Sequence, residues 1–97
     1  MPREVLRPGR ICVITRGRDR GRKCVVVGSV DDTSVLITGP KELNGVKRSR
    51  RNILHLMPLA ETIRIRVNSK DETVLAAIEK SGLKDFMREI MRVEDAG

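Results

Sequence analysis

The chain has 97 residues and carries 20 Lys and Arg against 13 Asp and Glu, so its net charge is +7. This length fits one domain with one modest core, and 39% hydrophobic residues suit a globular rather than a disordered protein. No apolar run approaches the ~20 residues of a membrane span and the start has no signal-peptide apolar core, which predicts a cytoplasmic soluble protein. The positive net charge predicts a polyanionic partner.

The first half of the chain is predicted to form short strands separated by turns. Runs rich in β-branched residues at 11–15, 23–27 and 34–38 favour strands. Residues 16–22, between the first two runs, are all glycine or charged, so they are expected to form a loop. Asp31 and Asp32 before Thr33 are typical turn formers, and Asn44-Gly45 indicates another turn.

Two further apolar segments complete the predicted β region. Residues 53–57 are apolar up to Pro58, and residues 63–67 alternate strictly between apolar side chains and arginine. Such alternation is typical of a strand buried on one face. Several short strands with frequent turns predict a mainly β fold, a small barrel over residues 1–68.

Residues 69–97 are predicted to form a helical extension packed on the barrel. Ser69 and Glu72 fit a capping box that begins a helix over 71–80, and Ser81-Gly82 ends it. A second helix follows with one continuous apolar stripe, too short to be stable alone in water, so it must dock on the rest of the chain. The stripe consists of Leu83, Phe86, Met87, Ile90 and Met91.

The positive charge is concentrated in the first half of the chain. Residues 1–51 hold 13 Lys and Arg against 5 Asp and Glu, a net of +8, whereas residues 52–97 hold 7 against 8, a net of −1. Arg outnumbers Lys by 14 to 6, which favours forked recognition of phosphate.

Two basic clusters, at 16–23 and 47–51, are predicted to meet on one rim of the barrel and to bind an anionic ligand. The basic side chains of the first cluster repel one another when the loop is free, and an anionic ligand would relieve this repulsion. The alternative is a solvated run of charges without function. Gly17 and Gly21 allow positive φ and a close approach of phosphate. The residues predicted to bind this ligand, which the family resemblance described next implies is RNA, are Arg10, Arg16, Gly17, Arg18, Arg20, Gly21, Arg22, Lys23, Lys47, Arg48, Arg50 and Arg51.

The segment from Pro8 to Val27 resembles a KOW motif, the strand–loop–strand unit of many translation proteins, with Gly21 at the motif's characteristic glycine. With 37–40 and 46–52, nearly the whole chain resembles the archaeal and eukaryotic family of large-subunit ribosomal protein L-fourteen-e. The resemblance implies an SH3-like barrel with a helical tail, bound to ribosomal RNA and neighbouring ribosomal proteins in the large subunit. The chain is shorter than the eukaryotic members, which fits an archaeal version.

The residue types also indicate how RNA would be contacted. Proteins that bind single strands stack bases on aromatic side chains, but the one aromatic residue, Phe86, lies on the apolar helical stripe. We therefore expect arginine contacts to the phosphate and ribose of folded RNA.

Catalytic and metal-binding chemistry are not expected. Two cysteines and the isolated His55 cannot supply a four-ligand zinc site, and no phosphate-cradling loop or activated nucleophile is present. The protein is predicted not to be an enzyme and to use no cofactor or small-molecule substrate. Cys12 and Cys24 are predicted to be small buried hydrophobes. Whether they could instead form a disulfide depends on the hairpin register, because a hairpin centred on Arg18 sets them directly opposite, whereas one centred on Asp19 leaves them diagonal.

The protein is expected to be monomeric when free. Three other functions compete with a ribosomal role. A KOW-bearing transcription or translation factor is the nearest. A DNA-binding regulator would use the C-terminal helices, but the second of these balances basic with acidic residues. A peptide-binding adaptor would need aromatic groove walls.

Overall fold

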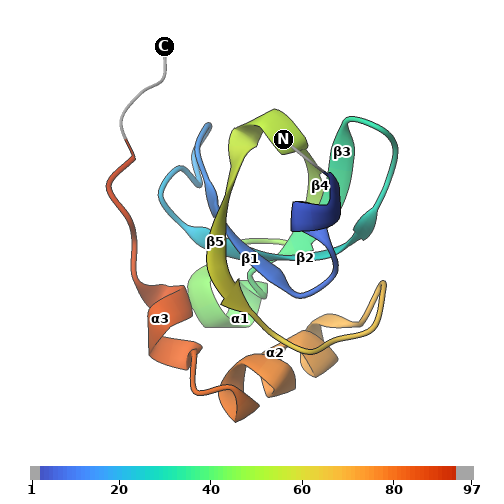
Figure 1. Cartoon of the computed structure of the whole chain (residues 1–97). Helices are drawn as coiled ribbons and strands as arrows, with labels where there is room; N and C mark the ends of the chain where they lie inside the picture. The colour runs from blue at the N-terminus through green and yellow to red at the C-terminus, as the bar shows by residue number, and fades with distance from the viewer. Residues whose placement is uncertain (1–2, 94–97) are drawn as a thin grey trace.

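A computed structural model describes residues 3–93 as a curved antiparallel sheet with the three α-helices below it (Figure 1). The strand order is β4-β3-β2-β1-β5. This confirms the predicted mainly β fold with a helical tail. The strands are β1 (Arg10–Ile14), β2 (Lys23–Ser29), β3 (Ser34–Thr38), β4 (Ser49–Asn52) and β5 (Leu56–Thr62). The helices are η1 (Arg3–Leu6), α1 (Lys41–Asn44), η2 (Ile53–His55), α2 (Asp71–Lys80) and α3 (Lys84–Arg88).

The β1–β2 hairpin has the register centred on Arg18. Cys12 pairs directly with Cys24, and both thiols are free and fully buried. Burial raises the pKa of Cys12 to about 12 and that of Cys24 well above its usual value. The two cysteines therefore serve as small apolar side chains, as predicted.

The sheet is buried on both of its faces in the region of β1 and β2. Along β2, Cys24 and Val26 point into the interior of the curved sheet, whereas Val25 and Val27 pack toward the helices. This explains the continuous apolar run in β2, because a strand covered on both faces does not alternate. The helix-side core also contains Ile11, Leu43, Ile63, Val74, Ile78 and Met87.

The prediction of a strand over residues 63–67 is wrong. The last strand, β5, lies earlier and runs through Pro58, which an edge strand paired only with β1 can accommodate. Residues 63–66 belong to no strand and have no ladder partner, yet Ile63 and Ile65 still face the helix-side core. The alternating sequence correctly indicated that one face of this segment is buried, but such alternation does not require a neighbouring strand.

The helical tail begins and ends differently from its prediction. Helix α2 spans the predicted residues 71–80, but the Ser69 hydroxyl donates to the Arg66 carbonyl (2.6 Å) instead of capping the helix, whose N-cap is Lys70. Helix α3 ends at Arg88, because Glu89 turns extended and the chain crosses to the β1–β2 loop. Ile90, predicted on the apolar stripe, is consequently 63% exposed.

Candidate nucleic-acid interface

The β1–β2 loop, residues 15–22, is closed by its own backbone hydrogen bonds. The amide of Gly21 donates to the Ile14 carbonyl (2.7 Å), and the amide of Arg22 donates to the Asp19 carbonyl (2.9 Å). Gly17 and Gly21 have φ values of 87° and 90°, which confirms the predicted left-handed backbone at both positions. The loop thus presents its arginines from a fixed turn.

The second basic cluster lies beside this loop, as predicted. Arg51 of β4 forms an ion pair with Asp19 (Nη2–Oδ2, 2.8 Å), and Arg22 donates to the Asn44 carbonyl at the end of α1 (2.8 Å). Between the two segments lies a groove of about 270 Å³. Its lining residues are Arg18, Asp19, Gly45, Lys47, Ser49 and Arg51.

Three cations at this groove and on the adjoining loop point into solvent. Arg16, Arg18 and Lys47 are exposed and make no ion pair or side-chain hydrogen bond within residues 3–93. Arg20, on the same loop, is also exposed. We call Arg16, Arg18, Arg20, Lys47 and Arg51 the rim surface. Its positive charge is offset within the groove only by Asp19, which is already paired with Arg51.

Arg48 and Arg50 lie next to the rim surface but bind to other parts of the chain. Arg48 forms an ion pair with Asp71 at the start of α2 (3.0 Å). Arg50 forms one with Asp31 (2.7 Å) while remaining 62% exposed. Hydrogen bonds from Thr33 and Ser34, together with the Arg50 guanidinium, lower the pKa of Asp31 to about 2. Asp31 therefore organises the β2–β3 turn, the role that its sequence context predicted.

Three of the predicted RNA-binding cations make hydrogen bonds that join parts of the fold. Arg10 donates to the carbonyls of Val5 and Leu59 (both 2.8 Å), which joins η1 to β5. Lys23 is only 1% exposed, and its Nζ donates to the Phe86 and Glu89 carbonyls (2.8 and 3.3 Å) and lies 4.1 Å from the Phe86 ring centroid. The side chain of Arg22 is part-buried against α1. Basicity in the sequence did not distinguish these roles.

The two loop glycines have different surroundings. A Cβ at Gly17 would meet nothing closer than the Arg51 guanidinium, 3.9 Å away. Gly21 is buried, its carbonyl accepts from the Met91 amide (2.8 Å), and a Cβ there would collide with the Met91 carbonyl oxygen. Gly21 therefore accommodates the segment after α3, and only Gly17 is open to a ligand.

Asn44 connects the loop with the helices, a role that the sequence analysis missed. Its side-chain amide donates to the Lys23 and Met87 carbonyls (2.8 and 3.1 Å), and its Oδ1 accepts from the Val46 amide (3.1 Å). The Asn-Gly pair signalled a turn, but nothing local in the sequence indicated these distant partners.

Other kinds of site receive no support from the described part of the chain. Within residues 3–93, no group of three or more His, Cys, Asp or Glu side chains gathers as metal ligands would. No helix in the same range is long and apolar enough to cross a membrane.

The chain is similar to archaeal proteins named large ribosomal subunit protein eL14. It is 57% identical to that of Hyperthermus butylicus over 89% of this chain and 88% of the relative. The identity is 54% to that of Sulfolobus acidocaldarius (87% and 88% covered) and 52% to that of Aeropyrum pernix (93% and 90% covered). No protein-family model matches the chain. On this similarity along nearly its whole length, the chain belongs to the family of large ribosomal subunit protein eL14.

Proposed function

We propose that this protein is a non-catalytic, structural constituent of the cytoplasmic large ribosomal subunit and that its rim surface binds ribosomal RNA. The relatives are named as proteins of that subunit. The observation that supports RNA binding is the meeting of two basic clusters, remote in sequence, on one groove. Neighbouring ribosomal proteins are the expected protein partners.

The chemistry of the rim surface suits the sugar–phosphate backbone. Arginine forks donate two parallel hydrogen bonds to a phosphate, and Arg16 and Arg18 have their donors free. The Phe86 ring is covered by Lys23, so base stacking on it is not part of the proposal. Such contacts hold the shape of a folded RNA and read little sequence.

Binding of this kind should depend strongly on salt. If the five cations of the rim surface each meet a phosphate, the log–log slope of affinity against salt is about −3.5 to −4.5. The alternative of a DNA-binding regulator is weakened because α3 has a single turn whose end is held by the buried Lys23.

The test is a triple variant that removes charge without removing intramolecular contacts, Arg16→Gln, Arg18→Gln and Lys47→Gln. Its matched control, Lys41→Gln, Lys84→Gln and Arg88→Gln, removes the same charge from exposed positions on the helices, together with the exposed Lys84–Glu79 ion pair (3.8 Å). Binding to archaeal large-subunit rRNA is measured across salt concentrations, and circular dichroism checks the fold.

We expect the rim variant to lose at least tenfold in affinity and to reduce the salt slope by about 2 to 3, because about one counterion is released per phosphate contact. The control should stay close to the parent protein. Equal losses in both variants would mean that net charge alone drives binding, and an unchanged rim variant would reject the rim surface.

A further inference from the structure

The connection between β5 and α2 is held rigidly at both ends, although it belongs to no sheet. At one end the Ile63 amide donates to the Gly9 carbonyl (2.9 Å), and a Cβ at Gly9 would collide with the Ile63 carbonyl oxygen. At the other end the Asn68 amide donates to the Val27 carbonyl (2.6 Å), and a Cβ at Gly28 would collide with the Asn68 side chain. Two glycines thus let this connection lie directly on the strands.

The alternating sequence of this connection divides its side chains between the core and the surface. Ile63 and Ile65 turn toward the helix-side core, so Arg64 and Arg66 are left exposed on the outside. Residues 63–70 contain three cations and no Asp or Glu. The acidic residues that follow from position 71 onward hide this local excess when charge is counted over the whole second half of the chain.

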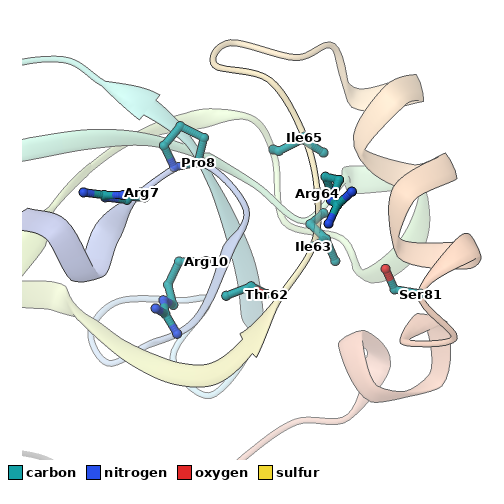
Figure 2. Close-up of a pocket in the computed structure, with 8 residues that line it drawn as sticks. All are labelled: Arg7, Pro8, Arg10, Thr62, Ile63, Arg64, Ile65 and Ser81. Atoms are coloured by element: carbon teal, nitrogen blue, oxygen red, sulfur yellow. The ribbon is translucent and has the colours of Figure 1, made fainter.

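Arg64 lies where three adjoining hollows meet. It lines one of about 560 Å³ with Arg7 and Ser81, one of about 620 Å³ with Arg66 and Lys70, and one of about 290 Å³ with Lys80. No Asp or Glu lines any of the three. Figure 2 shows the first hollow, with Arg7 and Arg10 toward one end and Arg64 and Ser81 toward the other.

Helix α2 separates the two signs of charge. Its carboxylates Asp71, Glu72 and Glu79 line a groove against α1, where Asp71 also pairs with Arg48. Lys80 at its end and Lys70 at its N-cap instead line the hollows that they share with Arg64. The hollows therefore keep an uncompensated positive charge, with the hydroxyls of Thr73 and Ser81 among it.

We propose that Arg7, Arg64, Arg66, Lys70 and Lys80, here called the linker surface, bind a second stretch of ribosomal RNA backbone. Guanidinium, ammonium and hydroxyl groups are the usual donors to phosphate oxygens. Several hollows in a row suit successive phosphates of one strand better than a single small anion. In Figure 1 the β1–β2 loop and the connection between β5 and α2 lie on opposite sides of the molecule, so one RNA segment at the rim surface does not also occupy the linker surface.

This inference rests on the proposed function, since it extends RNA binding from one side of the barrel to the other. The test uses the full chain with Arg64→Gln and Arg66→Gln, which changes two exposed side chains and no residue of the rim surface. The matched control is Lys41→Gln with Arg88→Gln, which lowers the net charge equally. Hydroxyl-radical footprints on archaeal large-subunit rRNA are compared among both variants and the rim variant.

The expected result is two sets of protected nucleotides. The linker variant should lose one set and reduce the salt slope by about 1.5 to 2, whereas the rim variant should lose the other set. A linker variant with the parent footprint and slope would overturn the linker surface even if the rim surface holds. If that variant instead lost retention on immobilised polyglutamate alone, an acidic protein segment would be the ligand, and the proposal would be wrong. The proposed function is tested separately by the rim variant, which alone should lose the footprint of the rim surface.

Discussion

Lys23 shows how a single cation can change its role through burial. A charged ammonium without solvent is costly unless its donors are satisfied, and here two carbonyls at the end of α3 and the Phe86 ring surround it. The position of Nζ also suits the negative end of a helix. Lys23 therefore fastens α3 to the start of β2.

Replacing Lys23 by methionine is expected to lower the free energy of unfolding by about 2 kcal/mol, because two carbonyls lose their buried donor. Urea unfolding followed by circular dichroism measures this. The matched variant Lys47→Met, at an exposed position, should change stability by no more than about 0.5 kcal/mol. A Lys23→Met protein as stable as the parent would show that the buried contacts are energetically neutral.

At this scale the sequence predicted the chemistry of the residues better than their surroundings. The exposed loop arginines and the buried cysteines were identified correctly, because loop composition and β-branched neighbours are local signals. Lys23 could not be separated from Arg20, since its partners lie more than sixty positions away in the chain. For Arg64 and Arg66, the sequence pattern predicted only that they lie on the polar face of a strand.

Among the elements, the β1–β2 hairpin depends on two glycines for two different reasons. Both have positive φ, but only Gly21 lies under the segment that follows α3. The backbone strain of an alanine at either site should be similar, of order 1 kcal/mol, whereas the collision with Met91 occurs only at one.

Gly21→Ala is therefore expected to destabilise the protein by about 2 to 4 kcal/mol, and Gly17→Ala by about 1 kcal/mol. Thermal unfolding of the two variants gives the comparison directly. The difference between them measures the docking of residues 89–91 on the hairpin. Identical melting temperatures would mean that this docking adds little to stability.

The elements were predictable where a local pattern decides them. Hairpins, turns and the ten residues of α2 follow from glycine positions and apolar periodicity. The end of α3 was not predictable, because the apolar stripe continues to Met91 while Lys23 and Gly21 draw the chain away after Arg88. The same limit applies to residues 63–67, whose alternation reflects one buried face without a neighbouring strand.

For the molecule as a whole, one sheet supports two cores and carries positive charge on two sides. The inner core is enclosed by the curved sheet, and the other joins β1 and β2 to α2 and α3. We propose that the barrel and the helical extension unfold together, because these strands contribute to both cores. A rigid body with cations on separate sides suits a component placed between RNA segments.

Because both thiols lie inside the curved sheet, their chemical reactivity measures how often the interior of the protein opens to solvent. At pH 8 burial keeps Cys12 and Cys24 protonated, so alkylation by iodoacetamide requires exposure of the interior. Native protein should react at least ~1000-fold more slowly than protein in denaturant, in line with ordinary unfolding equilibria. Mass spectra taken during the reaction should show chains with no label or two, whereas a build-up of singly labelled chains would indicate that one strand can separate alone. The same measurement in the presence of ribosomal RNA tests whether RNA slows this opening, as the proposed function predicts.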